Sequence, residues 1–362
     1  MQRETPGNDP SARVPIAQAP LVQLRRANHG THAIDLRREP IEARGQARDA
    51  GPVWRDRRDL ERMSAIETGA RFSPSGVLPL LTLPALALLL RSRMSGWGFM
   101  SAMALALYAG CKWLTYWELR TRTVAIAINR RRAFGYLFAW PGMAAKAFLC
   151  ESGAEVGKPS STEWIAAGLK TLLGATLTWF VARIALPDYP LVAGWLGMIG
   201  LIFVLHFGTF HLLSLGWRRL RVNAMPVMRN PLRSTSLAEF WGRRWNTAFH
   251  ELAARFTFRP LRRVVGLTGA SLLVFLVSGL IHELVISLPA HGGYGLPTGY
   301  FLLQGLGLAA ERTPRGRRLG LGHGWRGWMF TMLVTSAPAF WLFPPPFILR
   351  VILPMLAVIG AS

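Results

Sequence analysis

Long runs of apolar residues, separated by short polar links, make up most of the chain after its first seventy positions. Eight of these runs approach the roughly 20 residues that a helix needs to cross a bilayer: 76–90, 96–117, 164–186, 191–217, 264–288, 297–310, 327–343 and 347–359. The run 96–117 has Trp97 at one end and Trp113 and Trp117 at the other, where aromatic rings meet the lipid headgroups. The pattern predicts an all-α polytopic membrane protein with about eight transmembrane helices.

The apolar stretch 134–150, FGYLFAWPGMAAKAFLC, has a different character. It is short and contains Pro141, Gly142 and Lys146. Pro and Gly both weaken a continuous helix, and a cation in the middle of a span is costly. We therefore expect a re-entrant or interfacial segment rather than a helix that crosses the membrane.

Residues 1–70 have the opposite composition, with few large apolar side chains among many Arg, Asp, Glu, Pro and Gly residues. Such a segment cannot bury enough apolar surface to offset the entropy lost on ordering. We expect a disordered, charged amino-terminal extension over 1–70 and a membrane-embedded domain over 71–362. Met63, near the end of the extension, is an alternative start.

Basic residues are concentrated among the apolar runs. The chain has 42 Lys and Arg residues against 19 Asp and Glu, and the first 71 residues account for 13 and 10 of these. The Arg-rich links 218–263 and 312–326 alternate with the cation-free links 187–190 and 289–296. The positive-inside rule therefore places the amino terminus and the Arg-rich links in the cytoplasm. This composition excludes a soluble globular enzyme, and we expect a bacterial inner-membrane location.

His282 is the most conspicuous ionisable residue inside an expected span, in VFLVSGLIHELVISL. Ionisable groups at such positions are costly and are functional candidates, and imidazole transfers protons near neutral pH. A structural histidine bonded to a carbonyl is the alternative. Glu283 projects about 100° away on a helix, so we do not assign it to catalysis. If the span begins at 264, His282 lies about 27 Å along its axis, which favours a tunnel into the membrane.

The other candidate metal ligands and nucleophiles have simpler interpretations. His206 and His211 are separated by about 140° on a helix and do not share a face, so we interpret them as packing residues. The sequence HELVI has Ile286 where a zinc protease needs its second His. Cys111 and Cys150 lack the spacing of a metal site and are too few for a disulfide framework. We expect no metal.

The link before the span of His282 has an amphipathic pattern. Apolar residues recur there at helical steps of three or four, at Leu237, Trp241, Trp245, Phe249, Leu252 and Phe256. This spacing predicts a helix that lies on or dips into the membrane. Its polar side offers Arg243, Arg244 and Asn246, and Arg forks suit a phosphate-bearing substrate. Ordinary positive-inside charge is the alternative, and nucleic acid is excluded because these cations belong to short links between spans.

The block SLAEFWGRRWN (236–246), followed by SGLIHEL (278–284), resembles the wax-synthase branch of the membrane-bound O-acyltransferase superfamily. The segment YLFAWPGMAAKAFL (136–149) also resembles that branch. The similarity spans about 136–310 and leaves out residues 1–70 and the last span. The combination of an FW-x3-WN block with an intramembrane His is quite specific.

The resemblance implies a membrane-embedded enzyme that moves an acyl group from acyl-CoA to the hydroxyl of a lipophilic alcohol. It assigns His282 as the general base, and Asn246 as the residue that polarises the thioester or orients the acceptor. The substrate-binding candidates are Trp241, Arg243, Arg244 and Trp245. Acyl-CoA is then a co-substrate, the alcohol and the lipid bilayer are the partners, and no cofactor is expected.

Two alternatives remain open from the sequence. The first keeps the chemistry but transfers an acetyl or acyl group to a polyol, a polysaccharide or a secondary metabolite. The second is a non-catalytic lipid transporter, which needs a continuous polar pathway, and the polar groups within the expected spans are few. Replacing His282 by Ala discriminates between enzyme and transporter, because transport does not need the base.

Overall fold

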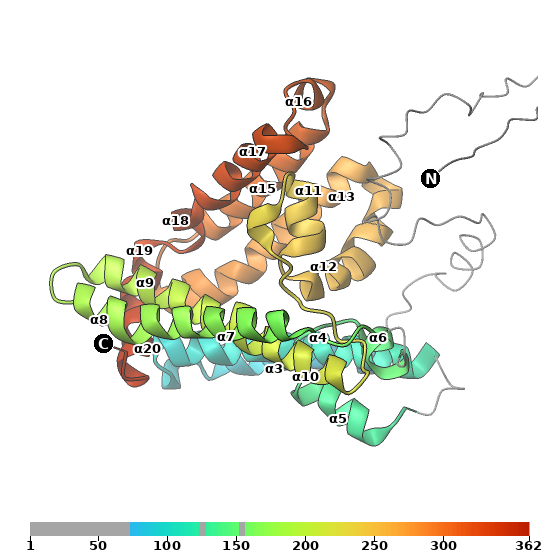
Figure 1. The fold of residues 1–362 in the computed structure, drawn as a ribbon, viewed down its shortest axis with the longest axis horizontal. Helices are drawn as coiled ribbons and strands as arrows, with labels where there is room; N and C mark the ends of the chain where they lie inside the picture. The colour runs from blue at the N-terminus through green and yellow to red at the C-terminus, as the bar shows by residue number, and fades with distance from the viewer. Residues whose placement is uncertain (1–72, 123–127, 152–155, 362) are drawn as a thin grey trace, which may run out of the picture. The chain divides into compact units, whose positions relative to one another are not determined.

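The computed structural model describes residues 73–122, 128–151 and 156–361, and within these residues every regular element is a helix. The predicted all-α class is confirmed. The expected extension 1–70 lies outside the described residues. The α-helices, labelled in Figure 1, are α3 (Pro74–Leu89), α4 (Gly96–Arg122), α5 (Arg130–Phe138), α6 (Ala145–Cys150), α7 (Ser161–Thr176), α8 (Ala182–Ala185), α9 (Pro190–Ile202), α10 (Phe210–Arg219), α11 (Leu237–Glu239), α12 (Thr247–Ala253), α13 (Arg259–His282), α14 (Leu288–Ala290), α15 (Leu296–Arg312), α16 (Pro314–Arg318), α17 (Gly324–Ser336), α18 (Ala339–Leu342), α19 (Pro345–Phe347) and α20 (Leu353–Val358).

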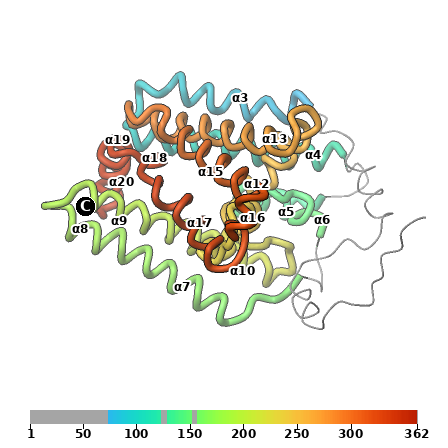
Figure 2. The backbone as a smooth tube through the Cα atoms, turned by 90° about the horizontal axis from the view of Figure 1, so that it is seen from above, coloured from blue at the N-terminus to red at the C-terminus, as the bar shows by residue number. Residues whose placement is uncertain are grey.

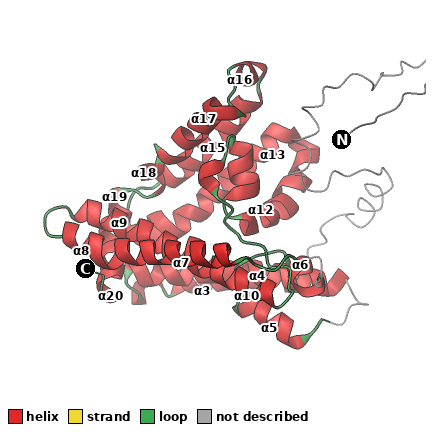
Figure 3. Cartoon of the chain, viewed as in Figure 1, coloured by secondary structure: helices red, strands yellow, loops and turns green. Residues whose placement is uncertain are grey.

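Several of these helices are continued by wider π-helical turns, so that the helical segments are longer than the labels suggest (Figure 3). In the described residues, three segments are long and apolar enough to cross a membrane: Ser161–Ala185, Pro190–Arg219 and Thr247–Ala290. The pair Gly324–Leu342 and Pro345–Val358, bent by 59°, adds a fourth if it forms one span. These helices, which accord with the expected spans 164–186, 191–217 and 264–288, are those of an integral membrane protein.

The expected number of about eight transmembrane helices is not confirmed. Helices α3 and α15 have 16 and 17 residues, fewer than the roughly 20 that a full crossing needs. Helix α4 has 27 residues, but it contains Lys112, Glu118, Arg120 and Arg122 and is not among the three segments apolar enough to cross. The two carboxyl-terminal runs form one bent pair. Length and composition thus support fewer crossings than the count of apolar runs suggested.

Neighbouring helices pack in antiparallel pairs, and small residues allow the closest approaches. Helix α7 lies along α9 and the turn Phe203–Thr209, and a Cβ built on Gly174 would lie 2.6 Å from the carbonyl oxygen of Gly200. Helix α15 lies between α13 and α17 in both views (Figures 1 and 2). In the turn Ile348–Ile352, which contacts α4 and α9, the side chains of Ile348, Val351 and Ile352 are buried.

The expected continuous amphipathic helix over 237–256 is wrong. Helix α11 and the turn Phe240–Arg244 end at Trp245, whose backbone is extended, and Asn246 is left-handed with φ +45°. A new helix begins at Thr247 and continues to Ala290. Gly266, with φ +72° and ψ −177°, breaks this segment in a conformation that only glycine adopts readily. The helix that carries His282 therefore begins after Gly266, close to the start at 264 expected from the sequence.

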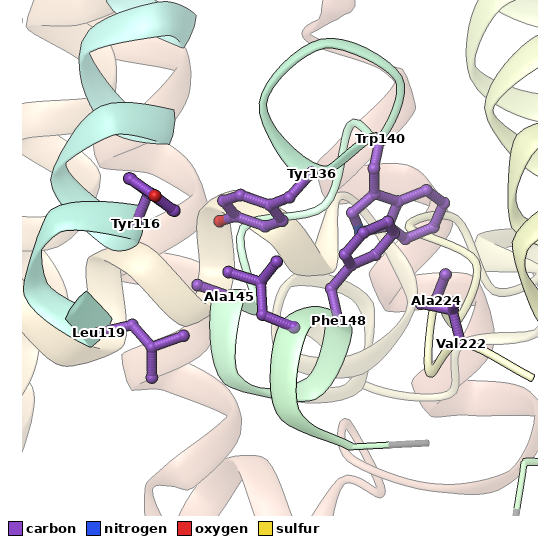
Figure 4. Close-up of a cluster of buried hydrophobic side chains, with 9 residues drawn as sticks. Tyr116, Leu119, Tyr136, Trp140, Ala145, Phe148, Val222 and Ala224 are labelled. Atoms are coloured by element: carbon purple, nitrogen blue, oxygen red, sulfur yellow. The ribbon is translucent and has the colours of Figure 1, made fainter. Parts of the chain in front are cut away.

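The segment 134–150 forms two short helices, α5 and α6, joined by a buried non-helical loop. Neither helix is long enough to cross a bilayer, in agreement with the prediction of a non-crossing segment. Tyr136, Trp140 and Phe148 form an aromatic core there with residues of α4 and of the strand-like stretch around Val222 (Figure 4).

The carbonyls of this buried loop are satisfied by side chains. Tyr108 donates to the carbonyl of Trp140 at 2.9 Å, Lys112 to that of Gly142 at 2.6 Å, and Tyr136 to that of Met143 at 3.1 Å. Lys112 is 1% exposed and also lies 3.4 Å from the ring centroid of Tyr136. Helix α4 therefore supplies two of the three donors that make an irregular backbone tolerable in apolar surroundings.

Candidate functional site

His282 is the last residue of α13, and its hydrogen bond determines which ring nitrogen is available. Its Nδ1 lies 2.7 Å from the carbonyl oxygen of Ser278, one turn earlier. A carbonyl can only accept, so Nδ1 carries the proton and Nε2 keeps its lone pair. Within the described residues Nε2 has no hydrogen-bond partner. The ring of Phe301, from α15, lies 4.4 Å away between centroids. This arrangement presents a basic nitrogen beside an apolar wall.

Glu283 points away from this nitrogen, as expected. Its Oε1 accepts hydrogen bonds from the backbone N–H of Gly295 and of Thr298, both at 3.1 Å, and from the Thr298 hydroxyl at 2.9 Å. These donors lie at the start of α15, where backbone N–H groups lack helical partners and favour an anion. The Glu283 carboxylate therefore connects the turn that follows α13 to the start of α15.

Asn246 lies at the break before α12. Backbone hydrogen bonds connect the residues on either side of it with the stretch 227–229. Val227 accepts from the N–H of Thr247 at 3.0 Å, and the N–H of Arg229 donates to the carbonyl of Arg244 at 2.8 Å. The N–H of Asn246 itself lies 3.2 Å from the sulfur of Met228. Its side-chain amide makes no hydrogen bond within the described residues, so the amide group is free for a ligand.

A row of aromatic rings connects the block around Asn246 with His282. Trp245 stacks on Phe240 at 5.6 Å, and Phe240 meets Trp241 at 5.1 Å. Trp241 in turn lies 5.8 Å from Phe301, the ring that contacts His282. Both Trp241 and His282 thus contact the ring of Phe301. No hydrogen bond within the described residues joins Asn246 directly to His282.

The two arginines of the block have different surroundings. Arg244 donates from Nε to Glu239 at 2.7 Å, and its other nitrogens reach Glu239 and the carbonyls of Arg229 and Asn230. These bonds hold the block in shape. Arg243 is exposed and has no hydrogen bond or ion pair within the described residues. Of the two predicted phosphate contacts, Arg243 is the one whose donors are free, and both assignments stay predictions.

Two residues of α15 belong to this site and were not predicted. Phe301 contacts both Trp241 and His282. Gln304, which is fully buried, accepts from the Trp241 indole at 3.3 Å and donates to the Val334 carbonyl at 2.8 Å. The signal for Gln304 was present, because an amide in the apolar run FLLQGLGL needs a partner. Phe301 carried no such signal.

A cavity of about 230 Å³ lies elsewhere, between the start of α6 and the residues Glu251–Phe256. Its charged lining residues are Lys146, Arg255, Glu151 and Glu251, two cations and two carboxylates. Arg255 is also bound to Glu118 at 2.8 Å. Neither His282 nor Asn246 lines this cavity, so its volume does not mark the place of the chemistry. Among the described residues, no group of three His, Cys, Asp or Glu residues could hold a metal ion.

Comparison with known proteins relates this site to one class of enzyme. Residues 224–303 match the family described as "Membrane bound O-acyl transferase family". The matched segment contains Trp241, Asn246, His282 and Phe301 and ends just before Gln304. Over this segment the chain is similar to that family, in agreement with the resemblance predicted from the sequence.

Individual relatives agree with this relationship. The chain is 35% identical over 101 residues to a "Long-chain-alcohol O-fatty-acyltransferase" of Simmondsia chinensis, covering 25% of this chain and 29% of the relative. It is 32% identical over 140 residues to a "Probable long-chain-alcohol O-fatty-acyltransferase 7" of Arabidopsis thaliana, covering 34% and 40%. An "Acyl-CoA--sterol O-acyltransferase 1" of the same plant is 29% identical over 142 residues, covering 34% and 38%. The chain thus matches less than half the length of each of these relatives.

Proposed function

We propose that the protein is a membrane-bound O-acyltransferase that moves an acyl group from acyl-CoA to the hydroxyl of a lipophilic alcohol, with His282 as the general base. The homology of residues 224–303 and the names of the relatives support the reaction class. The observation that carries the role of His282 is its hydrogen bond to the Ser278 carbonyl, which leaves Nε2 unprotonated beside Phe301.

In the proposed reaction, Nε2 of His282 takes the proton of the alcohol while the alcohol oxygen attacks the thioester carbonyl carbon. The carbon–sulfur bond then breaks, and the CoA thiolate leaves with the electron pair. The proton on the imidazolium passes to that thiolate or to solvent, so His282 returns to its neutral state. The products are an ester and free CoA. A thiolate needs little acid assistance, because a thiol has a pKa of about 8.5.

The neighbouring residues receive roles that match their surroundings. Asn246 has a free side-chain amide, which can donate to the oxygen of the thioester as negative charge develops there. Trp241 and Trp245 form an apolar, aromatic side of the block, suited to the acyl chain or the alcohol. Arg243, exposed at the same block, is suited to the phosphates of CoA from the cytoplasmic side. We place the amino terminus in the cytoplasm and the protein in a bacterial inner membrane.

The test is an assay of membrane fractions with labelled acetyl-CoA or palmitoyl-CoA and a panel of fatty alcohols, sterols, diacylglycerol and sugars. Wild type and His282→Ala are compared at equal amounts of folded protein. We expect a labelled ester from wild type with a lipophilic alcohol, and none from His282→Ala. An ester formed at the same rate by His282→Ala would remove His282 from catalysis. An ester formed only with sugars would replace the proposed acceptor class.

A further inference from the structure

One face of α15 contacts both halves of the proposed site. Phe301, Gln304, Leu308 and Glu311 are spaced by three, four and three residues, so they lie on one side of the helix, and all four are buried. Phe301 contacts His282, whereas Gln304 and Glu311 bind the block that begins at Leu237. Helix α15 therefore determines where that block lies relative to α13.

Glu311 makes the most specific of these contacts. Its carboxylate is 6% exposed and accepts the backbone N–H of Leu237 at 2.7 Å and that of Ala238 at 3.1 Å, one with each oxygen. Two donors bound to two oxygens of one rigid group define a direction as well as a distance. A buried carboxylate left without these donors would be strongly destabilised.

Two further contacts reinforce the same junction. The Leu237 side chain lies directly over Gly307, where a Cβ would come within 2.7 Å of Leu237 Cδ1. Arg312, next to Glu311, donates to the hydroxyl of Ser271 on α13 at 3.3 Å. Consecutive residues of α15 thus bind the two segments that carry Asn246 and His282.

We propose that Glu311 is a positioning residue for acyl transfer, which holds the block 237–246 against α15 so that Trp241 and Asn246 keep their places relative to His282. This inference rests on the proposed function. An apolar residue at 311 could pack α11 against α15, but it could not orient the two N–H groups that begin the block. A positional error of about 1 Å at a reacting group can cost about a hundredfold in rate.

Loss of this contact has a chemical consequence that differs from simple destabilisation. A misplaced block orients the alcohol less well and admits water, and water attacks the same thioester to give a free fatty acid and CoA. The ratio of ester to free fatty acid therefore reports positioning. This ratio does not depend on how much enzyme is folded, because both products come from the same active molecules.

The experiment measures ester and free fatty acid together, with labelled palmitoyl-CoA and the alcohol that wild type uses best. The variants are Glu311→Ala, Glu311→Gln and Glu311→Asp. The matched control is Glu163→Gln, which removes a carboxylate that binds Arg218 between α7 and α10, away from the block. We expect the ratio to fall about tenfold or more in Glu311→Ala, less in Glu311→Gln, which keeps one acceptor, and least in Glu311→Asp, which keeps the carboxylate.

The control is expected to keep the wild-type ratio even if less protein folds. An unchanged ratio in Glu311→Ala and Glu311→Gln would overturn the positioning role and leave the proposed function intact. If Glu311→Ala does not fold, the near-isosteric Glu311→Gln decides alone. Wild type that forms no ester with any alcohol would instead overturn the proposed function, and this inference with it.

Discussion

The helical pair formed by residues 161–219 and the region formed by residues 237–312 are both helical and rich in apolar residues, yet different interactions hold them in place. In the first, close packing of small residues dominates, as between Gly174 and Gly200, and the ion pair of Glu163 with Arg218 lies where α7 begins and α10 ends. In the second, buried or half-buried carboxylates bind backbone N–H groups, as Glu283 and Glu311 do.

The two kinds of interaction correspond to a difference in backbone regularity between the regions. Straight helices satisfy their own backbone groups and need only complementary surfaces. The region 237–312 contains the extended Trp245, the left-handed Asn246 and the interrupted helix at Gly266. Side chains bind backbone N–H groups at several points there: the Met228 sulfur lies near the N–H of Asn246, and Glu283 and Glu311 accept the N–H groups where α15 and α11 begin. The candidate chemistry lies entirely in the second region.

The largest expected effect separates two histidines, one in each region. His282→Ala should lower turnover by a factor of about 10² to 10⁴, the range typical of a lost general base. His211→Ala, in α10, should stay near wild type, because His211 lies outside the proposed site. Initial rates of ester formation per folded molecule measure both. If both variants lost the same fraction of the ester-formation rate, the proposed functional difference between the two regions would be wrong.

Substitutions at Asn246 should have the next largest effect. Asn246 has φ +45°, a conformation that Asn tolerates and most residues do not, so Asn246→Ala changes both the amide and the backbone preference. Asn246→Gly removes only the amide. We expect Asn246→Gly to lower kcat by about tenfold to a thousandfold, as for a lost oxyanion donor.

The matched control for that prediction is Asn230→Gly. Asn230 is also left-handed, with φ +48°, and its side chain makes no capping hydrogen bond. Wild-type kinetics in Asn230→Gly together with a loss in Asn246→Gly would assign the effect to the amide. Wild-type kinetics in both would reduce Asn246 to a backbone role.

We expect a glycine substitution in the first region to affect mainly stability, and one in the second region to affect mainly activity. A Cβ at Gly174 would meet backbone atoms of Gly200 and Val204, which cannot move aside, so Gly174→Ala should lower stability by about 1–3 kcal/mol. Gly307→Ala would displace the Leu237 side chain and should lower kcat per folded molecule more than it lowers stability. Thermal unfolding and kinetics of the purified proteins measure the two effects. A larger loss of kcat in Gly174→Ala than in Gly307→Ala, at equal amounts of folded protein, would contradict this difference between the regions.

The smallest expected effect is the contribution of Glu239 to the dependence of Tm on pH in acid. Burial raises the pKa of Glu239, but the N–H of Thr235 and the guanidinium of Arg244 outweigh it and hold the pKa below the usual 4.5. A carboxylate with a lowered pKa stabilises the fold above its unfolded pKa, and this contribution is lost as the pH falls through the folded value. We therefore expect the Tm of wild type to fall more steeply below pH 4.5 than the Tm of Glu239→Gln. Parallel curves would contradict this prediction.

Local patterns predicted the first region well and the second only in part. The helices of residues 161–219 follow from long apolar runs, which is local information. In residues 237–256, apolar residues recur at helical spacing on both sides of the break at Trp245 and Asn246, so periodicity alone could not show the break. The break depends on bonds to Val227 and Arg229, which lie about 15 to 20 positions earlier.

The candidate site shows the same division. His282 and Asn246 were identified from an ionisable residue in an apolar run and from a resemblance. Phe301, Gln304 and Glu311 were not identified, because their roles arise from contacts with segments many positions away. Glu311, for example, binds Leu237 across 74 positions of sequence. The predicted number of crossings is not confirmed, because apolar composition does not distinguish short packed helices from spanning ones, and three or four helical segments of the described residues pass by length and composition.

The buried loop between α5 and α6 has a consequence for biogenesis. Its carbonyls depend on donors from α4, Tyr108 and Lys112, and an unsatisfied carbonyl away from water costs several kcal/mol. The loop can leave water only where α4 is already in place. Because α4 precedes the loop in the chain, it emerges from the ribosome first, and the order of synthesis matches the order in which these hydrogen bonds must form.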